Sequence, residues 1–199
     1  MKLWAVDPGG EHVGMAEFSN FAGVAGTGQC DRAWETTPET AVDAIAAAML
    51  NYEIDVLVVE EFRLYPDKAM AQTGSTMPTC EMIGCIKWAH RLDCRRRRDL
   101  FCAADDELDR RDDQGQSKRT KEHQKWMAQR ARNQNEVLLV LQPASIQKPT
   151  EGVLRKRGMK SVAKASAKQI REAGGVGDHA LSAELHGWHY LLRQTGEAQ

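Results

Sequence analysis

The feature that most constrains this chain is an apolar run that ends in one carboxylate and is followed at once by a tight turn. Residues 3–16 read Leu-Trp-Ala-Val-Asp-Pro-Gly-Gly-Glu-His-Val-Gly-Met-Ala. Proline fixes φ and glycine permits positive φ, so the pattern predicts a β-hairpin. Pleat alternation then places Leu3, Ala5 and Asp7 on one face of the first strand. A carboxylate on a core-forming face needs a partner, which leaves two interpretations: a turn-forming Asp before Pro, or a metal ligand.

A second apolar run ends in acids in the same way. Residues 54–62 contain four consecutive apolar residues, three of them Val, followed by Glu60 and Glu61. This composition favours a strand that is buried on both faces in the middle of a sheet. Alternation places Glu60 on the same face as Val58 and turns Glu61 the other way. The alternative is an ordinary polar strand end.

A third acid opens the last predicted helix. Residues 174–177 are Gly-Gly-Val-Gly, and Asp178 follows them directly. The helix has an apolar stripe formed by Leu181, Leu185, Trp188 and Leu192. Asp178 lies one turn before this stripe, so we expect it to point towards the sheet. The alternative is an N-cap that gains from the helix dipole.

The remaining periodic segments complete an α/β pattern. They predict an edge strand over 21–30, a helix from Pro38 to about Asn51 with a Thr N-cap, a helix over 79–92 with Trp88 in the core, and a buried strand over 136–141.

Length and charge bound the organisation of the chain. At 199 residues, we expect a single domain over 1–199. The 27 basic and 28 acidic residues nearly cancel, so the overall charge does not indicate a nucleic-acid binder. The charge is concentrated, however, in a predicted insertion or arm at about 94–135, which begins with the four arginines 95–98. This segment is either a solvated, salt-bridged helix or a phosphate-contacting arm.

A second basic segment spans 148–171. It predicts a phosphate-contacting face, with a solvated lysine face as the alternative. Lys160, Lys164, Lys168 and Arg171 recur at helical spacing and would form a basic ridge on one face of a helix. The basic residues are Lys148, Arg155, Lys156, Arg157, Lys160, Lys164, Lys168 and Arg171.

The five cysteines form no Cys-x-x-Cys pair and are odd in number. This usage is typical of reduced thiols in a cytosol, so we expect a cytoplasmic protein. Asp7 interrupts the position where a signal peptide needs its apolar run. The longest apolar stretches are too short to cross a bilayer, so no membrane association is expected.

The three acids are more informative together than singly. Two strand ends and one helix start can converge at one edge of a sheet, where the carboxylates would repel each other unless cations neutralised them. Oxygen ligands of this kind suit Mg²⁺ or Mn²⁺ rather than zinc. Two such ions, about 4 Å apart, are a known device for hydrolysing phosphodiesters.

At these residues the chain resembles RuvC-like Holliday junction resolvases, with the divergent bacteriophage proteins closest. Three segments carry the resemblance, in the family's order and setting: Val6-Asp7-Pro8-Gly9 with Gly14, Val58-Val59-Glu60-Glu61-Phe62, and Gly177-Asp178-His179-Ala180-Leu181-Ser182-Ala183. The resemblance covers roughly residues 1–92 and 136–193. It implies an α/β, RNase H-like fold: a mixed sheet of about five strands, the first three antiparallel, flanked by helices.

The resemblance also implies a function. It implies a crossover-junction endodeoxyribonuclease that nicks four-way or branched DNA with Mg²⁺. A homodimer is implied because a four-way junction is two-fold symmetric and needs two nicks. Asp7 would bridge the metals, and Glu60 and Asp178 would each bind one. Phe62 or Tyr65 would stack on an unpaired base near the branch point.

The chain departs from the family at a fourth acid on the last helix, where Ser182 stands instead. Ser182 can hold a metal only through water. Glu61 or Glu184 would substitute, or the second metal would bind weakly. His179 is either a ligand or proton carrier, or a structural residue.

Three other functions compete with the resolvase. One is another RNase H-like nuclease, and one is a junction-binding protein that cuts weakly or not at all, which Ser182 keeps open. The third is an actin-like or sugar-kinase-like ATPase, which also begins with a strand-Asp-x-Gly hairpin. That fold needs two such domains, and this chain is too short for them.

Overall fold

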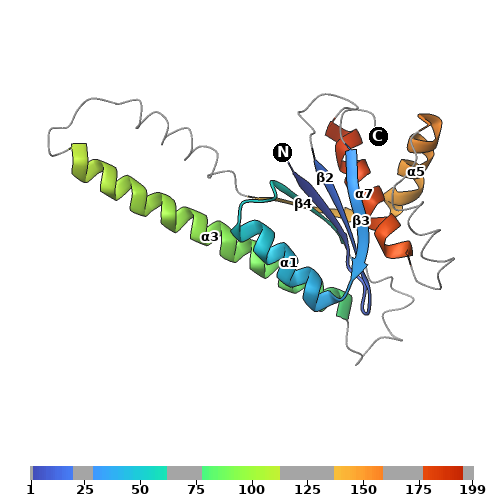
Figure 1. Cartoon of the computed structure of the whole chain (residues 1–199), viewed down its shortest axis with the longest axis horizontal. Coiled ribbons are helices and arrows are strands. Elements are labelled where there is room, and N and C mark those ends of the chain that lie inside the picture. The colour runs from blue at the N-terminus through green and yellow to red at the C-terminus, as the bar shows by residue number, and fades with distance from the viewer. Residues whose placement is uncertain (1, 20–28, 62–77, 113–136, 159–176, 195–199) are drawn as a thin grey trace.

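A computed structural model describes residues 2–19, 29–61, 78–112, 137–158 and 177–194 (Figure 1). Five strands form one sheet in the order β3-β2-β1-β4-β5. β1 is antiparallel to β2, β2 to β3, while β4 and β5 run parallel to β1. This order and these directions are those of the RNase H-like fold, so the predicted fold class is confirmed. The strands are β1 (Leu3–Asp7), β2 (Val13–Ser19), β3 (Gln29–Thr36), β4 (Val56–Glu61) and β5 (Leu138–Pro143).

Helices cover both faces of the sheet (Figure 1). On one face, α7 (Asp178–Gln194) packs over β1, β2 and β4, and α5 (Gln147–Lys156) packs against α7. A short 3₁₀ turn, η1 (Ala144–Ile146), joins β5 to α5. On the other face lie α1 (Pro38–Leu50) and α3 (Pro78–Asp112), which contact each other.

The side-chain alternation predicted for β1 and β4 sorts the core into two layers. Leu3 and Ala5 are fully buried in the layer under α7, and Val58 of β4 joins them there. Trp4 and Val6 belong to the other layer, with α1 and α3. Asp7 and Glu60 therefore end their strands on the α7 face.

The helix predicted from Pro38 forms as α1. Thr37 is its N-cap and accepts a hydrogen bond from the backbone N–H of Thr40 at 3.4 Å. Proline at the first helical position is tolerated because the N–H it lacks would have no partner there.

The helix predicted over 79–92 does not end at 92 but continues through residue 112. Asp93 and Arg97 form a buried ion pair at i, i+4 spacing, and Cys94 is buried beside them, which carries the packed stripe of α3 onward. The first part of the predicted charged insertion is therefore a continuation of α3.

Two of the four consecutive arginines hold α1 in place. Arg97 Nη2 donates to the carbonyl of Met49 at 2.9 Å, and Arg96 Nη2 donates to that of Leu50 at 3.0 Å. These carbonyls belong to the last turn of α1, and that of Met49 also accepts from the backbone N–H of Tyr52 at 3.2 Å. Both guanidinium groups also lie over the ring of Tyr52. A phosphate-contacting role is thus wrong for the buried Arg97.

Three other details differ from the sequence predictions. Trp88 is not in the core: its exposed fraction is 64%, because α3 turns Met82 and Ile86 inward and leaves Trp88 on the outer side. The third strand is an edge strand as predicted but spans Gln29–Thr36. β5 is also an edge strand rather than a buried one, and its Leu138 is half exposed.

None of the described helices combines the length and hydropathy that a membrane span requires. The four cysteines whose side chains the structure describes, Cys30, Cys80, Cys85 and Cys94, are free of disulfides.

We expect Arg97→Ala to lower the free energy of unfolding by about 3 kcal/mol, because it leaves the buried Asp93 carboxylate without its main partner. Arg96→Ala is the matched comparison, since the Arg96 side chain is 38% exposed and should contribute about 1 kcal/mol or less. Urea unfolding of both variants checks this, and equal losses would contradict the structural role assigned to Arg97.

Candidate active site

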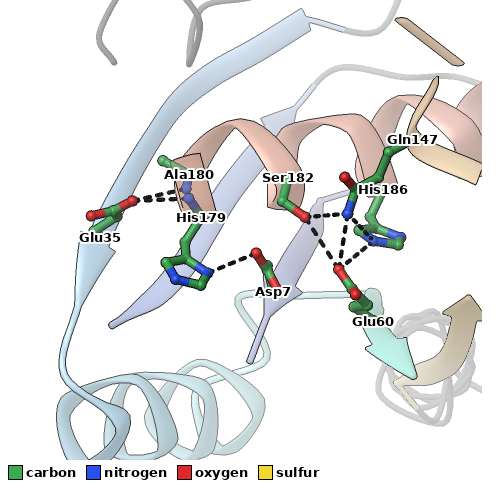
Figure 2. A network of polar contacts seen from close by, with 8 residues as sticks. All are labelled: Asp7, Glu35, Glu60, Gln147, His179, Ala180, Ser182 and His186. Atoms are coloured by element: carbon green, nitrogen blue, oxygen red, sulfur yellow. Dashed lines mark hydrogen bonds and ion pairs between the residues drawn. The ribbon is translucent and has the colours of Figure 1, made fainter. Parts of the chain in front are cut away.

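Two carboxylates lie at the ends of neighbouring parallel strands. Val6 of β1 stands beside Val59 of β4, so the residues that follow them, Asp7 and Glu60, emerge at the same edge of the sheet. Both side chains are largely buried, with exposed fractions of 13% and 18%. The predicted convergence of these two acids is therefore present in the structure (Figure 2).

Glu60 is held by three side chains through one oxygen. Its Oε2 accepts hydrogen bonds from Ser182 Oγ at 3.2 Å and Gln147 Nε2 at 3.1 Å, and it lies 2.9 Å from His186 Nε2. Gln147 also donates to Ser182 Oγ at 2.6 Å. Figure 2 shows Ser182 and His186 of α7 and Gln147 at the start of α5 meeting at this oxygen of Glu60 on β4.

His186 lies between two side chains at this end of the site. Its Nδ1 lies 3.0 Å from Oε1 of Gln142, and its Nε2 lies 2.9 Å from Glu60 Oε2. Because the ring is fully buried, these two contacts fix its orientation beside the Glu60 carboxylate.

The pKa of Glu60 reflects the same contacts. Burial acts to raise the pKa of this carboxyl. The hydrogen bond and charge of His186, together with the hydrogen bond from Ser182, outweigh burial and hold the pKa below the ordinary glutamate value. Glu60 is therefore ionised at neutral pH.

His179 is the corresponding partner of Asp7. Its Nδ1 lies 2.9 Å from Asp7 Oδ2, and this hydrogen bond raises the pKa of His179 against the opposing effect of burial. Each of the two carboxylates thus faces one histidine from α7 (Figure 2).

The N-terminus of α7 is fixed directly on the strands. Gly177, before the helix, has no side chain to cap it, and Glu35 of β3 accepts from the backbone N–H groups of His179 at 3.0 Å and Ala180 at 3.4 Å. A Cβ added to Gly14 of β2 would lie 1.9 Å from the carbonyl oxygen of His179. This close approach brings the first turn of α7 over Asp7.

Asp178 is exposed at the first position of α7, and the α7 residues that contact the two acids include His179 and Ser182. Asp178 and Ser182 lie four residues apart and share one side of the helix. The role of Asp178 as a ligand stays a prediction. Residues 182–192 are buried on every side of α7, so the apolar stripe could not define which side meets the acids.

The two acids proposed to replace the missing fourth carboxylate lie elsewhere. Strand alternation turns Glu61 to the opposite face of the sheet. Glu184 is fully buried and accepts from the indole Nε1 of Trp188 at 3.1 Å. Two residues along a helix correspond to about 200°, so Glu184 projects away from the side that carries Ser182.

The oxygen-rich donor set fits one hard dication better than two. Mg²⁺ is usually held by one or two carboxylates and keeps several waters, which matches Asp7 and Glu60. Within the part of the chain that the structure describes, no group of three or more His, Cys, Asp or Glu side chains is arranged to hold a metal ion. The ligand set of three acids, Asp7, Glu60 and Asp178, stays a prediction.

Several predicted DNA-contacting residues lie outside the described residues: Phe62, Tyr65, Lys160, Lys164, Lys168 and Arg171. Lys148 is exposed at the start of α5, directly after Gln147. Arg155, Lys156 and Arg157 are also exposed at its other end. DNA contact by these residues stays a prediction.

Sequence reasoning missed four residues of the site: Glu35, Gln142, Gln147 and His186. Gln142 pairs in register with Glu60 and ends an apolar strand just as Glu60 does. The amide at this strand end is therefore a local signal for the site, as the acids are. Glu35 acts across 144 residues of sequence, and no local pattern indicates such a contact.

No protein-family model matches the chain, and no curated protein sequence matches it. Among solved structures, Thermus thermophilus RuvC in complex with a Holliday junction substrate matches at 13% identity and a TM-score of 0.47, covering 100% of this chain and 98% of that one. A second Thermus thermophilus RuvC structure matches at 14% identity and a TM-score of 0.45, covering 100% and 99%. The Fowlpox virus resolvase bound to substrate Holliday junction DNA matches at 13% and 0.46, covering 96% and 99%.

We expect Gly14→Ala to destabilise the protein by at least about 3 kcal/mol, because the added methyl meets the backbone of α7 rather than a side chain that can move. Gly152→Ala in α5 is the control, since nothing lies within 4 Å of its added Cβ, and it should stabilise by up to about 1 kcal/mol. Thermal unfolding of both variants is the measurement, and a tolerated Gly14→Ala would refute the close approach of α7.

The raised pKa of His179 predicts a pH-dependent contribution to stability. The contact with Asp7 contributes fully below the ordinary histidine pKa of about 6.5, and this contribution is lost as the pH rises through the higher pKa of the folded state. The difference in unfolding free energy between the wild type and His179→Gln should therefore shrink with rising pH. Urea unfolding with a chelator present, at a series of pH values, tests this; a difference that stays constant or widens would be inconsistent with the contact.

Proposed function

We propose that this protein is a structure-selective endonuclease that hydrolyses phosphodiesters in four-way or branched DNA and depends on a divalent metal. The observation that carries the proposal is the pairing of Asp7 and Glu60 at the ends of two parallel strands, beneath the first turns of α7. The two acids stand in the first two of the three acidic motifs that resemble RuvC-like resolvases. The RNase H-like sheet supports the same assignment.

In this proposal, Asp7 and Glu60 hold Mg²⁺ or Mn²⁺ at the sheet edge. When bound, the metal supplies Lewis acidity, which activates water and stabilises the leaving oxygen. Asp178, exposed at the helix start, lies next in sequence to His179 and serves as the carboxylate of the third motif. A second ion would depend on it.

His179 is suited to moving a proton. When neutral and donating from Nδ1 to Asp7, it presents Nε2 as a proton acceptor. Its side chain is 37% exposed, so water and substrate can approach it. We assign it the proton-carrier role that the sequence left open beside a structural one.

The surroundings supply surface for a polyanion. Gln147 joins the site to α5, whose exposed Lys148, Arg155 and Lys156 we propose as phosphate contacts, together with the basic residues up to Arg171. We also propose that the protein acts as a homodimer in the cytoplasm, since a two-fold symmetric junction needs two nicks.

The proposal is tested by incubating the protein with a synthetic four-way junction, linear duplex and an RNA–DNA hybrid, with Mg²⁺, Mn²⁺ or EDTA. Paired, metal-dependent nicks at the branch point are expected. Tight junction binding without nicking would favour the alternative of a binding protein, for which the uncharged Ser182 beside Glu60 is the specific observation. Preferred cleavage of the hybrid would instead indicate another RNase H-like nuclease.

We expect Glu60→Gln to slow junction cleavage by about 10³-fold, since several kcal/mol of charge stabilisation are lost. Glu61→Gln is the matched control: it is the adjacent acid on the other face of the same strand, and its cleavage rate should stay close to that of the wild type. Single-turnover rates on the junction give the comparison. Equal losses in the two variants would remove the basis for placing the site on the α7 face.

A further inference from the structure

One row of paired residues leads from the active site to the outer strand of the sheet. Asp7 of β1 pairs in register with Gly14 of β2, and Gly14 pairs with Glu35 of β3. Residues that lie directly opposite each other on neighbouring strands point to the same face of a sheet. Asp7 and Glu35 are therefore two acids on the α7 face, with Gly14 between them.

Gly14 leaves a gap in this row, and the first turn of α7 fills it. A Cβ added to Gly14 would lie 1.9 Å from the carbonyl oxygen of His179 and 2.8 Å from the backbone nitrogen of Ala180. The backbone of His179 thus lies directly over Gly14, between the two acids (Figure 2).

His179 is held from both sides of this gap. Its backbone N–H donates to Glu35 Oε1 at 3.0 Å, and its ring Nδ1 lies 2.9 Å from Asp7 Oδ2. The N–H of Ala180 reaches the same oxygen of Glu35 at 3.4 Å. One set of contacts fixes the backbone and the other fixes the ring, so the place of the imidazole depends on both.

The first turn of α7 depends on Glu35 because its N–H groups have no partner within the helix. Gly177, the residue before the helix, has no side chain that could accept from them. Helix ends fray when they are not held. If Glu35 released the first turn, the backbone of His179 would be free to move relative to Asp7.

We propose that Glu35 is a positioning residue of the nuclease site, which holds the backbone of His179 and so sets its imidazole against Asp7. Glu35 acts through the first turn of α7 rather than on the reacting atoms. The inference rests on the proposed function, because it gives Glu35 a part in that reaction.

Two substitutions separate the reach of Glu35 from its charge. Both N–H groups go to one oxygen, so the amide oxygen of Glu35→Gln can accept them without the charge. Glu35→Asp keeps the charge, but it is one methylene shorter and should not reach the helix. We therefore expect Glu35→Gln to behave like the wild type and Glu35→Asp to behave like Glu35→Ala.

Single-turnover cleavage of a synthetic four-way junction is the first readout. At saturating protein, Glu35→Asp and Glu35→Ala should cut roughly tenfold or more slowly with unchanged junction affinity, because a misplaced group slows the reaction without weakening substrate binding.

Glu17→Ala is the matched control for this measurement. Glu17 is an acid of the neighbouring strand β2, and it pairs with Arg32 of β3. It stands in register with Trp4, whose side chain belongs to the core layer under α1 and α3, so these contacts lie on the other face of the sheet. Its cleavage rate should stay close to that of the wild type.

Hydrogen exchange of the His179 and Ala180 amides is the second readout, measured on the full-length chain without DNA or metal. Exchange should be faster in Glu35→Asp and Glu35→Ala and unchanged in Glu35→Gln, with circular dichroism confirming that each variant is folded. If Glu35→Ala does not fold, the comparison of Glu35→Asp with Glu35→Gln carries the test.

Three results would overturn the proposal. The first is a Glu35→Gln variant that cuts as slowly as Glu35→Asp, because the charge and not the contact would then matter. The others are wild-type cleavage in every variant, and slow cleavage without faster amide exchange. A wild type that cuts no junction would instead refute the proposed function, while the amide exchange would still decide whether Glu35 holds His179.

Discussion

The arrangement of the candidate active site depends on two carboxylates, Asp7 and Glu60, that lie side by side at one edge of the sheet. Parallel strands β1 and β4 deliver Asp7 and Glu60 to the same place, where both are largely shielded from water. Such a pair is costly unless cationic or hydrogen-bonding groups offset it. α7 provides these groups: His179 faces Asp7, and His186 and Ser182 face Glu60. The helix must therefore lie close to the strands, and the rest of that face is arranged to allow it.

The close approach of α7 to the strands depends on contacts from several other elements. Gly14 lets the helix backbone approach β2, and Glu35 reaches from the edge strand to cap its first N–H groups. At the other end of the site, Gln147 links Glu60 to α5, and Gln142 links His186 to β5. Four strands and two helices thus contribute to one small polar cluster, and that arrangement restricts the freedom of the two carboxylates.

The faces of the strand residues could be predicted from local sequence, because side chains alternate along a β-strand with a fixed period of two. The faces of Asp7 and Glu60 follow from it. The hairpin follows from the Pro-Gly-Gly turn, and the mixed five-stranded sheet was implied by the family resemblance. The contacts that His179 and His186 make with the two acids did not follow, because α7 is buried nearly all round and its apolar pattern does not identify one inner side. The surface position of Trp88 could not be predicted from its size and hydrophobicity, because α3 buries Met82 and Ile86 on its inner side and leaves Trp88 on the outer one.

The charged segment after residue 93 shows why net charge alone does not assign function. Arg96 and Arg97 belong to a run that resembles a phosphate-binding motif, yet they cap the last turn of α1. α3 therefore uses these two arginines to hold the fold together.

The central claim is that Asp7 and Glu60 together form a divalent-metal site. Its most direct test is a titration of Mn²⁺ into the protein, followed by electron paramagnetic resonance, for the wild type, Asp7→Asn and Glu61→Gln. The account predicts saturable Mn²⁺ binding that is lost in Asp7→Asn and kept in Glu61→Gln. Equal Mn²⁺ binding by all three proteins would contradict it, because the ion would then be held somewhere other than the paired strand ends.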